Sequence, residues 1–265
     1  MTAIAVTIAG SDSSGGAGIQ ADLKTFAALN VYGASVITAL TAQNTRGVTA
    51  IHDVPAAFIT AQIDAVFADL NVGAVKIGML SQPAAIEAVA AGLDRWSQTL
   101  VVLDPVMVAT SGDRLLAPDA VGVLTRELFP RALVVTPNLP EAAALLDAPL
   151  ATNESEMRQQ AERLLALGAK TVLIKGGHAG GPESVDLLVS PGATARLVAE
   201  RVPGANTHGT GCTLSSAIAA GLAKGQRLGE AVADAKHYVT EAIRAADDLA
   251  IGGGHGPVHH FHAWW

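Results

Sequence analysis

Short β-branched runs alternate with longer Ala- and Leu-rich segments along the chain, and this alternation most constrains the fold. The intervening segments have helical spacing, and Met157, Ala161 and Leu164, for example, fall on one helix face. Alternating strands and helices predict an α/β fold with a largely parallel sheet, whose ligands bind at the carboxyl ends of the strands. The expected buried strands cover residues 4–8, 36–40, 75–77, 100–103, 133–136 and 171–174.

The composition limits the class of function. The chain has 265 residues, of which 50% are hydrophobic, a formal net charge of −7 and one cysteine. This length supports one large core, so we expect one domain over residues 1–265. The negative charge and the low aromatic content argue against nucleic-acid binding. No apolar stretch is long enough for a membrane span and no secretory signal pattern is present, so we expect a cytoplasmic protein that acts on a small molecule.

A glycine-rich loop at residues 10–18 follows the first expected strand. Its glycines let a flat ligand approach the backbone, but the loop matches neither the dinucleotide-binding pattern nor the P-loop pattern. Asp22 borders the apolar face of the next helix. It is either a solvated residue at the flank of that helix or a hydrogen-bond acceptor for an amine of the ligand. Gln43 follows the second strand. It is either an ordinary turn residue or an amide that hydrogen-bonds to the edge of a heteroaromatic ring.

Two carboxylates follow neighbouring strands of the predicted sheet. Asp104 precedes Pro105, and Glu141 lies in the first turn of an expected helix. Turn geometry explains Asp104 alone and the helix dipole explains Glu141 alone, but neither explains both. Mg²⁺ is usually held by one or two carboxylates together with phosphate oxygens, so this pair indicates a magnesium site. Lys175, at the end of the last expected strand, could offset triphosphate charge or be an ordinary strand-end lysine.

The most informative segment is residues 206–213, Asn-Thr-His-Gly-Thr-Gly-Cys-Thr, directly before an expected helix. Glycines at a helix start let an anion approach unpaired N–H groups at the positive end of the helix dipole. Cys212 at this terminus is expected to have a depressed thiol pKa and to act as a base for a substrate hydroxyl. The alternative is a small buried hydrophobic residue.

The C-terminal tail is rich in histidine and ends in two tryptophans. A metal site there is disfavoured, because no H-E-x-x-H pattern occurs and the Gly- and Pro-interrupted tail is poorly preorganised. We expect the tail to pack against the domain or a neighbouring subunit. Its histidines are His255, His259, His260 and His262.

These motifs together resemble those of the hydroxymethylpyrimidine/phosphomethylpyrimidine kinase family of the ribokinase-like superfamily. The resemblance implies a three-layer α-β-α fold with a mainly parallel central sheet and a small flap. It also implies ATP-dependent phosphorylation of 4-amino-5-hydroxymethyl-2-methylpyrimidine to its monophosphate and then its diphosphate, for thiamin biosynthesis, and a homodimer. It rests on residues 9–22, 41–45, 104–107, 137–142, 175–178 and 206–213.

The resemblance further implies a role for each matched position. Those expected to line the pyrimidine pocket are Gly10, Asp22, Gln43, Met79 and Val106. Those expected at the transferring phosphoryl group are Cys212, as the base, and Gly209, Thr210 and Gly211. Those expected to contact ATP are Lys175, Thr207 and Asn138, and those expected to organise Mg²⁺ are Asp104 and Glu141.

Three other functions are alternatives to this prediction. A pyridoxal or pyridoxine kinase of the same superfamily is the nearest alternative, and a side activity on pyridoxal is compatible with the predicted site. A non-catalytic sensor would not need Asp104, Glu141 and Cys212 together. A dinucleotide-dependent oxidoreductase is disfavoured because Leu214 stands where the third glycine of G-x-G-x-x-G is required.

Overall fold

The computed structural model describes residues 2–107, 115–117, 119–178, 180–204 and 206–265. Its strands are β1 Ile4–Asp12, β2 Tyr32–Asn44, β3 Gly47–Asp53, β4 Ala74–Ile77, β5 Val101–Leu103, β6 Val134–Val135, β7 Val172–Lys175, β8 Glu183–Ser190 and β9 Ala193–Glu200. Its α-helices are α1 Gly18–Ala28, α2 Ala56–Phe67, α3 Pro83–Arg95, α4 Ala120–Leu128, α5 Leu139–Leu146, α6 Glu154–Ala166, α7 Thr210–Ala223 and α8 Leu228–Arg244.

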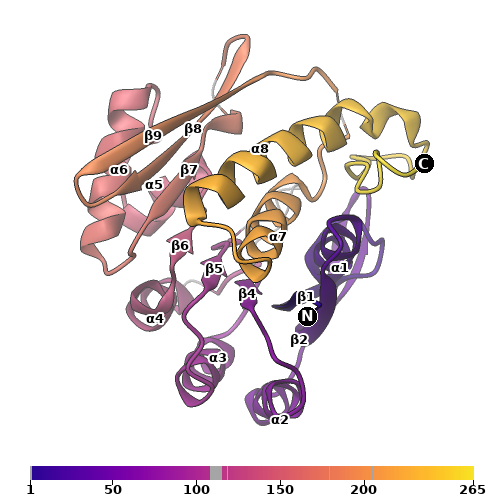
Figure 1. Cartoon of the computed structure of the whole chain (residues 1–265), viewed down its shortest axis with the longest axis vertical. Coiled ribbons are helices and arrows are strands. Elements are labelled where there is room, and N and C mark those ends of the chain that lie inside the picture. Colours follow the sequence, from indigo (N-terminus) through magenta and orange to yellow (C-terminus); the bar gives the residue numbers. More distant parts are fainter. Residues whose placement is uncertain (1, 108–114, 118, 179, 205) are drawn as a thin grey trace.

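The described strands form one sheet in the order β3-β2-β1-β4-β5-β6-β7-β8-β9 (Figure 1). The pairs from β2 to β7 are parallel, whereas β3, β8 and β9 are antiparallel to their neighbours. The predicted parallel strands are therefore confirmed. The Pro- and Gly-rich stretch at residues 182–192 predicts a surface hairpin or flap. These residues do lie in the hairpin of β8 and β9, but β8 pairs with β7, so the hairpin extends the main sheet.

Helices cover both faces of the sheet (Figure 1). Because side chains alternate across a strand, β1 contributes to two separate cores. Val6 and Ile8 belong to the cluster that includes Ile63 and Ile86 of α2 and α3, whereas Ala5 belongs to the cluster that includes α7 and α8. Each fully buried aliphatic side chain stabilises such a core by about 1.5–3 kcal/mol. The predicted three-layer α-β-α arrangement is confirmed.

Strand β1 is irregular near its carboxyl end. Its parallel register with β2 shifts between Ala9 and Ser11. Such irregularities turn the backbone out of the regular ladder and often lie beside functional sites. Here the shift occurs at Gly10, the first residue of the predicted glycine loop, and β1 stays paired with β2 through Ser11 and Asp12, so the loop leaves the sheet only after Asp12.

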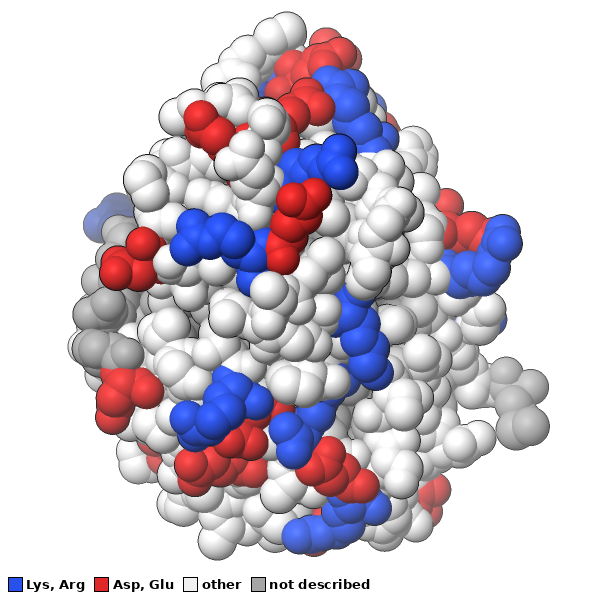
Figure 2. All heavy atoms as spheres, turned by 90° about the vertical axis from the view of Figure 1, so that its left-hand side faces the viewer, with Lys and Arg blue, Asp and Glu red and all other residues white. Residues whose placement is uncertain are grey.

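Charges on the molecular surface are mixed in sign. On the face drawn in Figure 2, Lys and Arg side chains are interspersed with Asp and Glu side chains. Surface pairs such as Arg196 with Glu154 and Glu183 are examples of this mixing. This face therefore does not resemble the continuous basic surface typical of nucleic-acid binding. Within the described part of the chain, no helix has both the length and the apolar composition needed to cross a bilayer.

Candidate active site

A cavity of about 720 Å³ lies at the carboxyl ends of the parallel strands. Its lining brings together residues from β1, β2, β4 and β7, the segment directly after β5, and the N-terminus of α7, which are far apart in the sequence. The predicted site residues that line it are Gly10, Gln43, Met79, Asp104, Val106, Asn138, Glu141, Lys175, Thr207, Gly209, Thr210, Gly211 and Cys212. Asp22 is the predicted site residue that does not line it.

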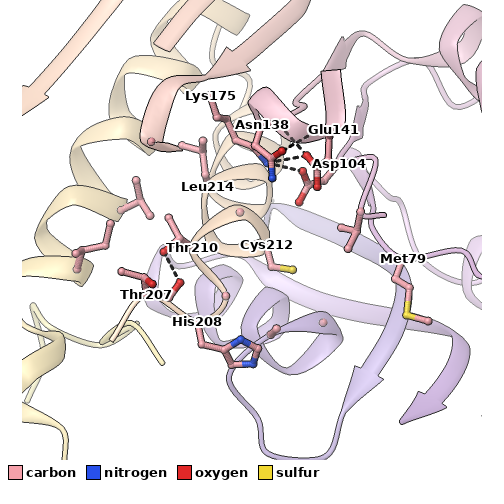
Figure 3. Close-up of a pocket in the computed structure, with 18 of the residues that line it drawn as sticks. Met79, Asp104, Asn138, Glu141, Lys175, Thr207, His208, Thr210, Cys212 and Leu214 are labelled. Carbon is pink, nitrogen blue, oxygen red and sulfur yellow. Dashed lines mark hydrogen bonds and ion pairs between the residues drawn. The ribbon is translucent and has the colours of Figure 1, made fainter. Parts of the chain in front are cut away.

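The Lys175 ammonium lies between two carboxylates (Figure 3). Its Nζ is 2.8 Å from Asp104 Oδ1 and 3.9 Å from Glu141 Oε2. The Asp104 carboxylate is also fixed by hydrogen bonds from Thr136 Oγ1 at 3.0 Å and Ser215 Oγ at 3.3 Å. Strands β5 and β7 and helix α5 thus hold three charged groups around one point of the cavity wall.

Burial and the neighbouring charges together set the pKa values in this cluster. Burial raises the pKa of Glu141 to about 7, a rise that Lys175 opposes and the charge of Asp104 increases. Burial also disfavours the charged form of Asp104, but Lys175 and Lys76 hold its pKa below the usual value. A further cation at this point would favour the ionised form of Glu141.

Glu141 has a second, structural role at the start of α5. The Asn138 backbone N–H donates to Glu141 Oε2 at 2.8 Å, and the Glu141 N–H donates to Asn138 Oδ1 at 2.8 Å. This reciprocal pair is a capping box, which satisfies two helix-terminal donors. Glu141 therefore has both of the roles between which its sequence position did not decide. It is an acid at the start of a helix and also a carboxylate in the cavity wall.

The first turn of α7 forms part of the cavity wall. Gly209 caps the helix with φ 81°, and a Cβ there would lie 1.9 Å from the Gly16 carbonyl oxygen, so only glycine fits. Gly211 and Cys212 occupy the second and third helical positions, whose N–H groups have no acceptor inside the helix. The N–H of Thr210, however, donates to the Thr207 carbonyl at 3.2 Å.

Cys212 points its sulfur into the cavity (Figure 3). The sequence predicted a depressed thiol pKa at this helix terminus, and that prediction is wrong for the protein without ligands. Burial raises the pKa of Cys212 to about 11. Lys76 and the Gly18 backbone N–H lower it, but Asp22 and Asp104 add to the rise. The helix dipole is therefore outweighed by desolvation and by two nearby carboxylates.

Asp22 lies beneath the cavity in the protein interior, not in its wall. Its carboxylate oxygens are 2.8 Å from Lys76 Nζ and accept hydrogen bonds from Thr7 Oγ1 and Ser216 Oγ, both at 2.6 Å. Asp22 and Lys76 are both fully buried. The predicted position of Asp22 in the pyrimidine pocket is thus contradicted, because its acceptors are already used by interior donors.

Lys76 does line the cavity, and sequence reasoning missed it. A signal was present, because a lysine within an apolar strand is rarely buried without a partner. Sequence reasoning also missed a group on the side of β8 and α8. There Asp186 accepts hydrogen bonds from Lys236 Nζ at 2.7 Å and from the Gly176 N–H at 2.8 Å. Both Asp186 and Lys236 line the cavity.

A second link that sequence reasoning missed joins the two glycine-rich loops. Asp12, the last residue of β1, lies 2.8 Å from His208 Nε2. Both residues line the cavity and both are buried. They belong to the two most specific motifs, but nothing in the sequence indicates that these motifs touch.

Comparison with known proteins places this geometry in a family. The family model described as phosphomethylpyrimidine kinase matches residues 12–259. The chain belongs to the phosphomethylpyrimidine kinase family. It is 63% identical over 265 residues to the hydroxymethylpyrimidine/phosphomethylpyrimidine kinase of Rhizobium meliloti, a match that covers 100% of this chain and 99% of that protein.

Two solved structures extend the comparison of this phosphomethylpyrimidine kinase family member. A phosphomethylpyrimidine kinase from Clostridium difficile 630 superposes with a TM-score of 0.80 at 48% identity, covering 91% of this chain and 99% of that chain. An ADP complex of Bacillus subtilis pyridoxal kinase superposes with a TM-score of 0.92 at 37% identity, covering 99% of each. The family, the ribokinase-like fold and the ATP-dependent kinase activity on the pyrimidine predicted from the sequence are confirmed.

Proposed function

We propose that the cavity binds 4-amino-5-hydroxymethyl-2-methylpyrimidine beside the phosphates of ATP and transfers two phosphoryl groups in succession. The observation that carries this proposal is that Gln43, Cys212 and Lys175 share one cavity. Gln43 offers a donor and an acceptor to the ring edge, with Gly10, Met79 and Val106 against the ring. Lys175, Thr207 and Asn138 would contact the phosphates of ATP.

The transferring phosphoryl group would lie at the N-terminus of α7. The N–H groups of Gly211 and Cys212 and the helix dipole favour negative charge there. Phosphoryl transfer passes through a loose transition state, so positioning and charge stabilisation supply most of the catalysis. The Thr210 N–H already has an acceptor in Thr207, so we assign Thr210 the smaller share of this stabilisation.

The residues present fit a magnesium ion. Asp104 and Glu141 supply the carboxylate oxygens that Mg²⁺ prefers, and they lie on either side of one ammonium, that of Lys175. Burial raises the pKa of Glu141 to about 7, and a bound cation would favour its ionised form. The ion would neutralise charge on the phosphates of ATP while Asp104 and Glu141 hold it in place.

Cys212 would accept the proton of the substrate hydroxyl in the first transfer. Only the thiolate of Cys212 can accept this proton, and a thiol pKa of about 11 leaves little thiolate at neutral pH. Cys212 must therefore release its own proton to solvent before it takes up the proton of the substrate hydroxyl. In the second transfer the acceptor is a phosphate, which has no hydroxyl proton of high pKa. Removing the thiol should therefore impair the first transfer more than the second.

The test uses purified protein with Mg-ATP and, separately, the pyrimidine alcohol, its monophosphate and pyridoxal, with products identified by mass. We expect mono- and diphosphorylated pyrimidine from the parent. In the Cys212→Ala variant we expect a first step slowed by about 10²-fold and a second step changed less. Equal loss in both steps would contradict the role of Cys212. Binding without phosphorylation would support the sensor alternative.

A side activity on pyridoxal is a second candidate function. The specific observation that favours it is the TM-score of 0.92 to a pyridoxal kinase. We also propose that residues 1–265 act as one kinase domain, that the protein is cytoplasmic and that it forms a homodimer. Size-exclusion chromatography with light scattering tests the last of these.

A further inference from the structure

The C-terminal strap, residues 254–260, contains three of the tail histidines for which the sequence analysis found no function. Residues 254 and 255 are exposed, whereas residues 256–260 are buried. The strap makes hydrogen bonds to two segments whose neighbouring residues line the cavity. These segments are the β2–β3 turn and the loop that precedes α7.

At its first end the strap holds the β2–β3 turn. The His255 N–H donates to the Thr45 carbonyl at 2.9 Å, and the Gly254 N–H donates to Thr45 Oγ1 at 3.2 Å. Thr45 stands two residues after Gln43, which lines the cavity. Hydrogen bonds that hold Thr45 therefore also restrict the position of Gln43.

In its middle the strap holds the loop before α7. The His208 N–H donates to the Gly256 carbonyl at 3.0 Å, and the Val258 N–H donates to the His208 carbonyl at 3.3 Å. The Gly256 N–H also donates to Asn206 Oδ1 at 3.1 Å. Since His208 directly precedes Gly209, the cap of α7, the strap fixes the backbone from which the anion-binding turn begins.

Beyond these contacts the strap is anchored on the helices. Thr213 Oγ1 of α7 lies 3.1 Å from His260 Nε2, and Tyr238 Oη of α8 donates to the His260 carbonyl at 2.6 Å. The His259 N–H donates to the Ala242 carbonyl of α8 at 2.9 Å. The strap thus has a fixed end, against which it can hold the turn and the loop.

We propose that the C-terminal strap is a positioning element of the active site, which sets the phosphate-binding N-terminus of α7 relative to the β2–β3 turn that follows Gln43. The roles of Gln43 and α7 in this inference rest on the proposed function. A misplacement of about 1 Å can cost up to about 10²-fold in rate, so small shifts of these segments are expected to be measurable.

Three neighbouring glycines allow a matched test. A Cβ at Gly254 would lie 2.1 Å from the Thr45 backbone oxygen, and a Cβ at Gly256 would lie 2.2 Å from Asn206 Oδ1. Asn206 cannot swing away freely, because its Nδ2 donates to Asp247 Oδ1 at 2.9 Å. A Cβ at Gly253, just before the strap, would meet only the end of the Arg46 side chain, at 2.9 Å. Gly253→Ala is therefore the control.

We expect Gly254→Ala to raise the KM for the pyrimidine about tenfold with kcat within about twofold of the parent. Gly256→Ala should lower kcat about tenfold and weaken binding of a magnesium-bound, non-hydrolysable ATP analogue, measured by calorimetry, by a similar factor. Gly253→Ala should match the parent in each measurement. Thermal unfolding of all the variants, and kinetics well below their Tm, separate positioning from loss of stability.

The strap proposal is wrong if both strap variants keep the parent's kcat, KM and nucleotide affinity, or if they lose only stability. A parent that binds both ligands but phosphorylates neither pyrimidine would instead contradict the proposed function. In that case, direct calorimetry with the pyrimidine and with the ATP analogue still tests the strap, because it measures binding without turnover.

Discussion

Asp12 and His208 are 196 positions apart in the chain, yet the Asp12 carboxylate lies 2.8 Å from His208 Nε2. The same carboxylate accepts hydrogen bonds from the backbone N–H groups of Ser14, Gly16 and Ala17. Burial disfavours its charge, but the hydrogen bonds from His208, Ser14 and Ala17 lower the pKa of Asp12 to about 2. One ionised carboxylate therefore joins the glycine loop after β1 to the loop before α7.

Replacing Asp12 by Asn should lower the free energy of unfolding. Because the pKa of Asp12 falls from 3.8 to about 2 on folding, the ionised group stabilises the fold by about 2 kcal/mol above about pH 4. That difference between parent and variant should shrink as the pH falls from about 4 to about 2. Urea denaturation over this range measures it. Asp69→Asn, on an exposed carboxylate, is the control, and a pH-independent difference would contradict the prediction.

The buried pair of Asp22 and Lys76 gives a second prediction. Removing one partner of a buried ion pair leaves an uncompensated charge and typically costs about 3–5 kcal/mol. We expect Asp22→Asn to destabilise the protein by roughly this amount in urea denaturation. The double variant Asp22→Asn with Lys76→Met should lose much less than the sum of the two single variants.

If Asp22 instead bound the substrate amine, the contrasting result would be a nearly unchanged free energy of unfolding with a raised KM for the pyrimidine. This comparison separates the predicted binding role from the interior position that Asp22 occupies.

The raised thiol pKa of Cys212 predicts slow alkylation at neutral pH. Only the thiolate reacts, so the rate with iodoacetamide should rise from about pH 7 to about pH 10 without a plateau. As Cys212 is the only cysteine of the chain, mass spectrometry of the intact protein follows this one site. If the alkylation rate instead reached a plateau below about pH 8, the thiol pKa would be depressed, as its position at the helix terminus predicted.

His260 should make the fold sensitive to mild acid. Burial, with a smaller contribution from the positive charge of Lys24, lowers its pKa from 6.5 to about 3. Between these values the unfolded chain binds a proton that the folded protein does not, so stability falls as the pH falls. The loss attributable to His260 should be about 1.4 kcal/mol per pH unit below about pH 6.5.

This expectation is checked by measuring the free energy of unfolding in urea at two pH values. One is near neutral, and the other is one unit below the ordinary histidine pKa. The His260→Gln variant should lose about 1.4 kcal/mol less than the parent between the two conditions. The variant of the exposed His237, His237→Gln, should behave like the parent. If the free energy of unfolding fell equally with pH in the parent and in His260→Gln, another group would be responsible for the pH dependence.

Most of the parallel sheet was predictable from the sequence, because strands buried on both faces are continuous apolar runs. Strand β3 was missed for the opposite reason. It is an edge strand with largely exposed residues, and even its Ile51 is exposed. Its pairing with β2 is decided by the turn between them, which a search for apolar runs does not detect.

The positions of the cavity residues were predictable wherever a strand end or a helix start is encoded locally. The electrostatics were not predictable. The state of Cys212 depends on Lys76, Asp22 and Asp104, which come from three other segments of the chain. Whether Asp22 faced the ligand or the interior likewise depended on Lys76, 54 positions away.

The strap is synthesised after both segments that it holds, and this order sets when the site can be assembled during synthesis. At about 5–20 residues per second, the ribosome adds the strap roughly 10–50 seconds after β1. Until residues 254–260 have left the ribosomal tunnel, the loop before α7 lacks its hydrogen bonds to Gly256 and Val258. The proposed role of the strap therefore implies that a nascent chain assembles this site only after the strap has emerged.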